Sequence, residues 1–358
     1  MTADRMRRLE ELIAERELDL LLVTDLVNVR WATGFTGSSA VAVVGPDVRT
    51  FVTDFRYLTQ SAEQVPDFER TIAQSDLLAG VAGTLPGDGP LRLGFDDATM
   101  AVKTHAQLRE RLRDEIELVP AGGLVEELRA IKDADEVAKI REAALLADAA
   151  LRAVLSKGLA GRTERDVALD LELEQRRRGA EAVSFPPIVA SGAHGALPHA
   201  EPRDVEIPSG TLVVIDWGCQ LDGYCSDCTR TYATGQPDPR DREIYEIVQR
   251  AQEAALAAVR PGPTGREVDA VARELIAAAG HGEHFGHGLG HGVGLAVHEA
   301  PRLSATSDAK LVAGQVVTVE PGVYLPGAVG VRIEDLVVVT EDGCEVLSGL
   351  PKDLTVVG

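Results

Sequence analysis

Five of the eight histidines of this chain lie in one glycine-rich segment, GEHFGHGLGHGVGLAVHE and the residue before it, which spans residues 281–299. Repeated glycines let the backbone approach a ligand closely and disfavour an ordinary amphipathic helix. Histidines in such a loop can serve metal binding or acid–base chemistry, or they can simply hydrogen-bond nearby carbonyls. Metal chemistry is favoured here because four acids stand out on strand-like sequence before and after the segment: Asp216, Asp227, Glu320 and Glu334.

The first two acids lie on a predicted β-hairpin formed by the runs TLVVIDWGC and GYCSDCTRTY. If Leu221 and Asp222 form the turn, Asp216 faces Asp227 directly; if the favoured Asp222-Gly223 turn forms, the two acids are diagonal neighbours. In either register they share one face of the hairpin, about 4.5–8 Å apart. Such a pair is either solvated or bridged by a cation, and the apolar flanking residues favour the cation.

The other two acids follow the histidine segment. Glu320 ends the apolar run VVTVEPGV, directly before a Pro-Gly turn, and Glu334 lies within GVRIEDLVVVT. Arg332 precedes Glu334 by two residues, so both are predicted on one face of a strand. A carboxylate in a buried strand is costly unless it is paired or bound to a metal. The sequence therefore leaves open a simple Arg332–Glu334 ion pair at a strand end.

Two aspartates, two glutamates and one imidazole on separate strands form an oxygen-rich set that suits two divalent ions. Such ligands indicate Mn²⁺, Co²⁺, Fe²⁺ or catalytic Zn²⁺, and not a closed thiolate zinc site. The predicted reaction class is metal-assisted hydrolysis, because two metals activate water and polarise a carbonyl. Cys225 and Cys228 form a C-x-x-C pair, but no second pair follows at zinc spacing and the segment predicts a strand.

The whole chain has 358 residues, a length that favours two domains. Its formal charge of −21 repels nucleic-acid backbones and anionic membranes, so we expect neither as a partner. No apolar run of 18 residues is present, and the charged N-terminal segment lacks the apolar core of a signal peptide. The four cysteines fit a reducing compartment. We therefore expect a cytoplasmic protein without a membrane span.

The chain is predicted to divide near residue 130, into domains of residues 1–130 and 131–358. In the first, apolar runs that predict strands alternate with helical stretches, which indicates an α/β domain. The predicted strands are residues 18–24, 40–45, 50–54 and 91–96, and the predicted helices are residues 55–64 and 104–115. A charged break and a long helical run ending at Gly158 then begin the second domain.

The second domain contains an internal repeat. GRTERDV (161–167) and GPTGREV (262–268) lie 101 residues apart, and Thr163 and Thr264 are the corresponding candidate N-caps. Two ordinary helix starts could also match by coincidence. The strands that follow each copy favour a duplicated α+β domain, whose pseudo-twofold axis would place a site between the two halves.

The motifs together resemble the pita-bread metallopeptidases, in particular the proline peptidases aminopeptidase P and prolidase. The matching segments occur in the family's order: IDWGCQLDGYCSDCTRT (215–231), GHGLGHGVGLAVHEAP (286–301), VEPGVY (319–324) and VRIEDLVVVT (331–340). TGFTGSS and FVTDFRYLTQ resemble the creatinase-type domain that precedes the catalytic one. The resemblance implies an α/β chain with an N-terminal creatinase-like α/β domain and a pita-bread α+β catalytic domain with a pseudo-twofold repeat.

The resemblance also implies a role for each matching residue. It implies that the dimetal ligands are Asp216, Asp227, His291, Glu320 and Glu334. Asp227 and Glu334 would bridge the two ions, and Glu320 would also move a proton. His199, His287 and His298 match histidines that bind substrate and stabilise the tetrahedral intermediate, and Arg332 and Tyr324 match residues that line the site. Ala296 stands where an acid is common in the family, and His281 and His284 match no functional position.

The implied reaction removes the N-terminal residue from small peptides with proline in second position, with two divalent ions, of which Mn²⁺ is favoured. The bond before proline is a tertiary amide without the N–H that ordinary peptidases bind. The TGFTGSS and TDFRY segments favour aminopeptidase P, which accepts longer chains; the alternative is prolidase, which takes dipeptides only. Methionine aminopeptidase resembles the second domain alone, and an inactive binding module of this fold would have lost a metal ligand. We also expect a homodimer or higher homo-oligomer.

Overall fold

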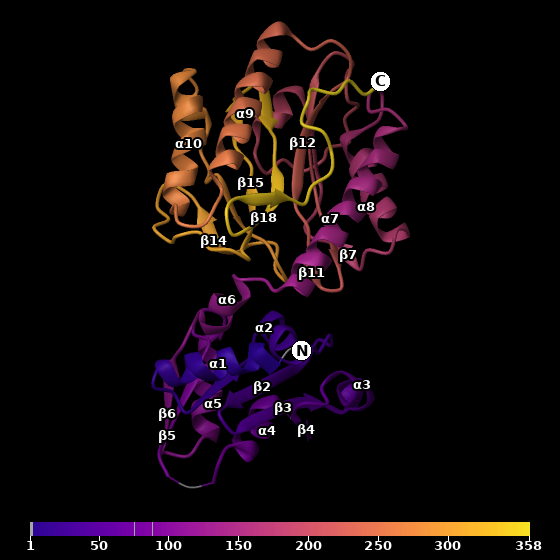
Figure 1. Cartoon of the computed structure of the whole chain (residues 1–358). Coiled ribbons are helices and arrows are strands. Elements are labelled where there is room, and N and C mark those ends of the chain that lie inside the picture. The colour runs from indigo at the N-terminus through magenta and orange to yellow at the C-terminus, as the bar shows by residue number, and fades with distance from the viewer. Residues whose placement is uncertain (1–2, 75, 88) are drawn as a thin grey trace. The chain divides into compact units, whose positions relative to one another are not determined.

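The computed structural model describes residues 3–74, 76–87 and 89–358. The chain divides into two compact units, Met1–Arg129 and Ala130–Gly358, both built from helices and strands (Figure 1). Within the described residues, no helix is both long enough and apolar enough to cross a membrane.

The N-terminal unit is an α/β domain around one six-stranded sheet with the order β4-β3-β2-β1-β5-β6. β2 pairs antiparallel with β1 and β3, and the other pairs are parallel. The strands are β1 (Leu20–Val23), β2 (Ala40–Gly45), β3 (Val48–Asp54), β4 (Glu69–Ala73), β5 (Leu91–Phe95) and β6 (Ile116–Pro120). The helices are α1 (Ala3–Glu15), α2 (Leu26–Thr33), η1 (Phe55–Tyr57), α3 (Leu58–Gln64), α4 (Leu77–Thr84), α5 (Val102–Arg111) and α6 (Leu124–Arg129).

All four strands predicted in this unit are confirmed, and two further strands were missed. The missed strands, β4 and β6, lie at the two edges of the sheet. Both carry charged residues and are only partly buried, so they lack the continuous apolar run that identified the central strands. Charged residues on edge strands limit pairing with other chains. The same charged residues interrupt the apolar pattern by which a strand is predicted from sequence.

The C-terminal unit consists of two helix pairs and four small sheets. Its helices are α7 (Ala134–Leu155), α8 (Glu164–Arg177), η2 (Gly192–Ala196), α9 (Pro239–Ala258), α10 (Gly265–Ala278) and η3 (Gly282–His284). Its strands are β7 (Ala182–Val183), β8 (Ile188–Ser191), β9 (Leu212–Trp217), β10 (Cys219–Leu221), β11 (Tyr224–Cys225), β12 (Cys228–Ala233), β13 (Gly290–Gly292), β14 (Glu299–Leu303), β15 (Val316–Val319), β16 (Gly322–Leu325), β17 (Val329–Arg332), β18 (Asp335–Val339) and β19 (Cys344–Val346). The sheets have the orders β12-β9-β8, β11-β10-β7, β14-β13-β15-β18-β19 and β16-β17.

Each helix pair of the C-terminal unit covers its own set of strands. α7 and α8 share a buried apolar core with β8 and β9. α9 and α10 share another with β15, β16, β17 and β18. In Figure 1 the two pairs lie on opposite outer sides of the strands. The apolar residues of the strands therefore pack against the helices. The polar residues of the strands can then line an internal cavity.

The internal repeat has a structural counterpart at the start of α8 and α10. The Thr163 side chain accepts a hydrogen bond from the Asp166 amide, and Thr264 forms a complete capping box with Glu267. Both predicted N-caps are thus confirmed. Each cap also forms an isolated antiparallel bridge to a later segment, Thr163 with Glu206 and Thr264 with Lys310. The two helices therefore begin in equivalent surroundings.

The predicted hairpin adopts the second of the two registers considered. Asp222 and Gly223 have φ values of 50° and 80°, the left-handed conformation that a two-residue Asp-Gly turn needs. The same register continues into β9 and β12, where Asp216 pairs with Thr229. Asp227 precedes Thr229 by two residues and is therefore the diagonal neighbour of Asp216. The turn sequence decides how close the two acids come.

Candidate metal centre

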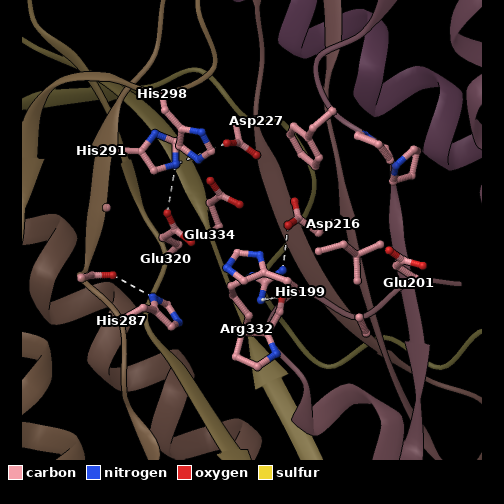
Figure 2. A pocket seen from close by; sticks show the side chains of 18 of the residues that line it. His199, Glu201, Asp216, Asp227, His287, His291, His298, Glu320, Arg332 and Glu334 are labelled. Carbon is pink, nitrogen blue, oxygen red and sulfur yellow. Dashed lines mark hydrogen bonds and ion pairs between the residues drawn. The ribbon is translucent and has the colours of Figure 1, made fainter. Parts of the chain in front are cut away.

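The structure brings all five residues predicted to bind metal to one cavity of about 530 Å³ in the C-terminal unit (Figure 2). Each comes from a different segment. Asp216 lies on β9, Asp227 directly precedes β12, His291 lies on β13, Glu320 directly follows β15, and Glu334 lies between β17 and β18. Strand ends and short links thus supply most of these side chains, so the sheets fix their positions.

Three of the carboxylates lie close together. Asp216, Asp227 and Glu334 each offer an oxygen within 4.8 Å of the other two. Burial and the neighbouring carboxylates raise the pKa of Asp227 well above its usual value. The pKa of Glu334 is raised in the same way and for the same reasons. This concentration of buried negative charge is unfavourable by itself and would be relieved by cations.

Two carboxylate oxygens of this group have no hydrogen-bond partner within the described residues. They are Oδ1 of Asp216 and Oε1 of Glu334, and both atoms are fully buried. Their companion oxygens are satisfied, by Arg332 and by Thr229 respectively. A buried acceptor left without a donor costs about 1–3 kcal/mol. Each of these two oxygens would be available to hold a divalent cation.

His291 also faces these acids with a nitrogen suited to a metal. Its Nδ1 lies 3.1 Å from the Gly292 carbonyl oxygen, so Nδ1–H donates there and Nε2 carries the lone pair. That Nε2 lies 3.6 Å from Asp227 Oδ2 and 3.3 Å from Glu320 Oε1. A lone pair directed at two carboxylates is repulsive unless a cation or a proton lies between them. The five residues therefore fit divalent ions by position and by donor chemistry.

Arg332 does not form the ion pair with Glu334 that the sequence left open. Its Nη2 instead donates to Asp216 Oδ2 at 2.7 Å. Its Nε donates to the Thr229 hydroxyl at 3.0 Å, and that hydroxyl donates to Glu334 Oε2 at 2.8 Å. Thr229 thus separates the guanidinium from Glu334. Arg332 therefore fixes Asp216, and no arginine or lysine among the described residues forms an ion pair with Asp227 or Glu334.

Tyr324 connects this guanidinium to one of the predicted histidines. Arg332 Nη1 lies 2.9 Å from the Tyr324 hydroxyl, which in turn lies 2.9 Å from His287 Nε2. His287 Nδ1 donates to the Gly288 carbonyl, so the chain runs from Arg332 through Tyr324 to a neutral imidazole. Burial lowers the pKa of His287, which agrees with the neutral form.

The other two predicted histidines lie at the same cavity. The His298 ring packs edge-on against His291, with 4.3 Å between ring centroids, and His199 lines the cavity wall (Figure 2). Both are exposed side chains. His281 and His284 do not line this cavity; their Nδ1 atoms lie 3.4 Å apart near η3. This agrees with the absence of a functional match for them.

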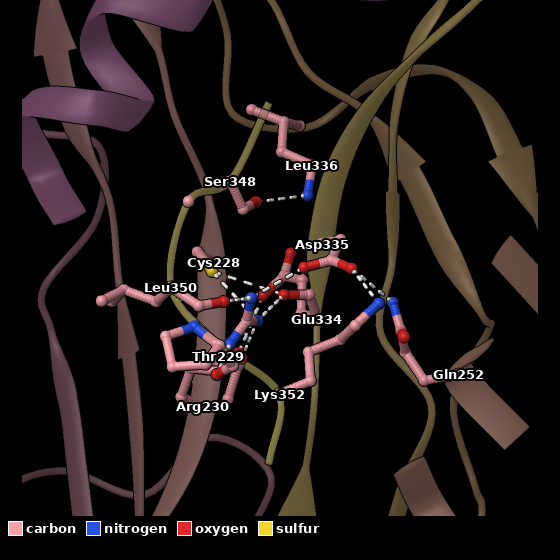
Figure 3. A network of polar contacts seen from close by, with 12 residues as sticks. Cys228, Thr229, Arg230, Gln252, Glu334, Asp335, Leu336, Ser348, Leu350 and Lys352 are labelled. Atoms are coloured by element: carbon pink, nitrogen blue, oxygen red, sulfur yellow. Dashed lines mark hydrogen bonds and ion pairs between the residues drawn. The ribbon is translucent and has the colours of Figure 1, made fainter. Parts of the chain in front are cut away.

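A compensated ion network lies behind the carboxylates (Figure 3). Asp335, the residue after Glu334, pairs with Arg230 at 2.7 Å and with Lys352 at 2.7 Å, and it accepts from Gln252 at 3.0 Å. Arg230 also donates to the Glu334 carbonyl oxygen. The backbone that carries Glu334 is therefore held from behind by a buried guanidinium. Sequence reasoning missed this network.

The cavity contains two further charged residues that sequence reasoning missed, Glu201 and Arg302. A second internal repeat could have identified the arginine, because the pattern H-x-x-P-R occurs at residues 199–203 and again at residues 298–302. The remaining wall is apolar and includes Phe185, Pro187 and Ile188. The cavity thus combines an acidic floor with an apolar wall and a cationic residue.

The duplicated α+β fold and the carboxylate–histidine centre define a metal-dependent hydrolase. The chain belongs to metallopeptidase family M24, whose family model matches residues 138–341, and residues 5–131 match the Creatinase/Prolidase N-terminal domain. The chain is therefore a peptidase, and its family implies divalent metal ions. Both parts of the fold class inferred from the resemblance are confirmed.

Three similar proteins extend this assignment along the whole chain. An Xaa-Pro dipeptidase of Pyrococcus furiosus is 35% identical over 98% of this chain and 99% of its own. The structure of an Xaa-Pro dipeptidase from Bacillus anthracis superposes with a TM-score of 0.95 at 40% identity, covering 99% of each chain. The structure of an X-Pro aminopeptidase from Thermotoga maritima has a TM-score of 0.90 at 35% identity, covering 98% of this chain and 100% of that one.

Proposed function

We propose that this protein is an Xaa-Pro dipeptidase that uses two divalent ions, with Mn²⁺ as the favoured metal. Dipeptidases among its similar proteins support this alternative better than the aminopeptidase P reading that the N-terminal segments favoured. Aminopeptidase activity is the second candidate, because the similar T. maritima structure is that of an X-Pro aminopeptidase. The cytoplasmic location and the homo-oligomeric state stay predictions.

The observation that carries the proposal is the position of Arg302. It lies on β14 opposite His291 on β13, and its exposed side chain lines the cavity. Among the described residues Arg302 forms no ion pair, whereas Arg332 is buried and paired with Asp216. An Xaa-Pro dipeptide carries its free carboxylate directly on the proline. A guanidinium suits that carboxylate, and a longer peptide would present a neutral amide in its place.

In the proposed mechanism the metal pair would be held by Asp216, Asp227, His291, Glu320 and Glu334. Divalent ions bound there would activate a water molecule and polarise the scissile carbonyl. Glu320 accepts the proton of the attacking water and delivers it to the proline nitrogen, because its carboxylate lies at the cavity and Thr318 orients it by a 3.0 Å hydrogen bond. His287, oriented by Tyr324, and His298 interact with the oxygen on which charge develops.

Proline selectivity follows from the apolar wall and from what proline lacks. Replacing proline by alanine adds an N–H that is left buried without a partner, at about 1–3 kcal/mol, and removes ring contacts of similar worth. Together these predict a preference for Ala-Pro over Ala-Ala of about a hundredfold or more in kcat/KM.

The test compares Ala-Pro, Ala-Pro-Ala and Ala-Ala at one fixed Mn²⁺ concentration, for the wild type and for Arg302→Ala. A dipeptidase cleaves Ala-Pro and leaves Ala-Pro-Ala nearly intact, and Arg302→Ala raises the KM for Ala-Pro. Comparable rates on Ala-Pro and Ala-Pro-Ala would move the assignment to an aminopeptidase. Comparable rates on Ala-Pro and Ala-Ala would contradict proline specificity altogether.

A further inference from the structure

Glu164, at the start of α8, is a fully buried carboxylate with an unusually complete set of hydrogen bonds. It accepts from the amide and the hydroxyl of Ser191, both at 2.8 Å, and its Oε2 lies 2.9 Å from His194 Nδ1. It also accepts from the amide of Arg203 at 3.1 Å and from two guanidinium nitrogens of Arg203, each at 3.0 Å. One side chain therefore binds both ends of the segment 191–203.

This segment forms one wall of the cavity. Five consecutive residues around His199 line the cavity: Pro198, His199, Ala200, Glu201 and Pro202. The middle of the segment is fixed separately, because Arg332 Nη1 donates to the Pro198 carbonyl at 3.1 Å. None of the residues that bind Glu164 lies among the five candidate metal ligands. Glu164 thus supports the wall without contacting a candidate metal ligand, whereas Arg332 contacts both the Pro198 carbonyl and Asp216.

Electrostatics shows how firmly Glu164 holds this segment. Burial alone would raise the pKa of Glu164, but the hydrogen bonds from Arg203 and Ser191 outweigh burial and lower it to about 2. The carboxylate is therefore ionised at neutral pH and forms charge-assisted hydrogen bonds, which are stronger than neutral ones. Loss of this charge would leave several donors unsatisfied in a buried place.

The second half of the duplicated domain lacks this clamp. In the repeat that aligns Thr163 with Thr264, Glu164 corresponds to Gly265. A Cβ atom on Gly265 would collide with the carbonyl oxygen of Arg302, so a side chain cannot be accommodated there without moving that segment. In the H-x-x-P-R repeat, Arg203 corresponds to Arg302. One arginine is thus neutralised by an acid and the other is left to face the cavity.

We propose that Glu164 is a positioning residue for substrate binding, which holds the wall segment 191–203 in place and keeps Arg203 away from the substrate. Through this segment it sets the position of His199. The inference rests on the proposed function, since its effect appears on Xaa-Pro dipeptides. It also explains why Arg302 is the arginine proposed to bind the dipeptide carboxylate: Arg203 is already paired with Glu164.

The test measures kcat, KM and Mn²⁺ affinity for Glu164→Gln and for Glu172→Gln, a control acid on the same helix that forms one exposed ion pair with Arg176. We expect kcat/KM for Ala-Pro to fall about ten- to a hundredfold in Glu164→Gln, because displacing a positioned group by about 1 Å can cost that much. Mn²⁺ affinity should stay within about twofold of the wild type, because the ligands are supported elsewhere. Glu172→Gln should behave as the wild type.

A double-mutant cycle with His199→Ala separates positioning from general damage. If Glu164 acts through His199, the double variant Glu164→Gln/His199→Ala should be about as active as His199→Ala alone. Full additivity, a loss of Mn²⁺ affinity in Glu164→Gln, or wild-type kinetics in that variant would each overturn the proposal. Failure of the wild type itself on Ala-Pro would instead overturn the proposed function.

Should Glu164→Gln not fold, Arg203→Ala provides the same test with a milder change. Its side chain is 45% exposed, so its removal should be tolerated, while Ser191 and His194 keep their bonds to Glu164. We expect kcat/KM to fall about three- to tenfold with unchanged Mn²⁺ affinity and with the same non-additivity towards His199→Ala. Additive losses in this variant would count against the proposal.

Discussion

Glu334 and Asp335 are adjacent residues, both buried and both acidic, yet their surroundings are opposite. Asp335 is compensated by two cations, Arg230 and Lys352 (Figure 3). Those cations hold the pKa of Asp335 below its usual value against the effect of burial. Within the described residues, the Glu334 carboxylate accepts one side-chain hydrogen bond, from the Thr229 hydroxyl. Burial and the nearby carboxylates (Figure 2) raise the pKa of Glu334 well above its usual value.

The contrast separates structural from functional burial of charge. A buried charge with matched partners is stable in the folded protein, and it is lost with a large penalty if one partner is removed. Buried like charges without partners persist only where something outside the chain completes them or where chemistry requires them. Asp227 and Glu334 belong to the second kind, and Asp335 belongs to the first.

The largest expected effect comes from an acid in the uncompensated group. Asp227→Asn should lower hydrolysis of Ala-Pro by about a thousandfold or more, because it removes one of the carboxylates that would hold the metal ions. Activity at saturating Mn²⁺ measures this. Asp222→Asn, on the exposed hairpin turn, serves as the control and should retain nearly full activity. Full activity of Asp227→Asn would show that the group is not the metal centre.

Replacing Asp335 and replacing Asp227 should change the free energy of unfolding of the metal-free protein in opposite directions. Asp335→Asn leaves Arg230 without a buried counter-ion and should lower the free energy of unfolding by about 3 kcal/mol. Asp227→Asn removes one of several like charges and should raise it by about 1 kcal/mol, as often happens when an active-site charge is deleted. Urea unfolding with a chelator present measures both. Equal losses in the two variants would remove the distinction.

Variants of His291 and His298 test which of these neighbouring histidines binds the metal. His291→Ala should reduce Mn²⁺ affinity about ten- to a hundredfold or more, because its Nε2 faces the carboxylates. His298→Ala should keep its metal and lose turnover, because its ring packs on His291 from outside the acidic group. Metal analysis of both purified variants decides this. Loss of metal from His298→Ala alone would reverse the two roles.

The smallest expected effect is a change in folding stability at low pH, and it concerns Glu164, a buried acid whose charge is compensated by Arg203. Its pKa is lowered from 4.5 to about 2, so its ionised form stabilises the folded state above about pH 4.5, and this contribution is lost as the pH falls towards 2. The difference in unfolding free energy between the wild type and Glu164→Gln should therefore shrink between neutral pH and about pH 3. Urea unfolding at both pH values checks this; a difference that stays constant or grows in acid would contradict it.

Turns and helix caps could be predicted from sequence, because residues close together in the chain determine them. The Asp222-Gly223 turn fixed the register that makes Asp227 a diagonal neighbour of Asp216, and the threonine caps identified the repeated helix starts. The network around Asp335 could not be predicted, because the residues that donate to this acid, Arg230, Gln252 and Lys352, come from segments far apart in the chain. Nothing in the local sequence of an acid shows whether a distant arginine will compensate it.

Arg302 escaped prediction for a different reason. The helix starts repeat at a spacing of 101 residues and the H-x-x-P-R pattern at 99, so the two repeats do not align in one register. Only the structure shows that Arg203 is bound by Glu164 while Arg302 lines the cavity. A duplicated sequence reveals equivalent positions, and tertiary contacts decide which copy is available to a ligand.

Direct titration of the metal-free protein with Mn²⁺ tests the central claim, that the uncompensated carboxylates form a dimetal centre. Calorimetry should show about two ions bound per chain in the wild type, with release of protons from the acids whose pKa is raised. Asp227→Asn should lose at least one of these ions, and Asp335→Asn should keep both. No binding by the wild type, or unchanged binding by Asp227→Asn, would contradict the account.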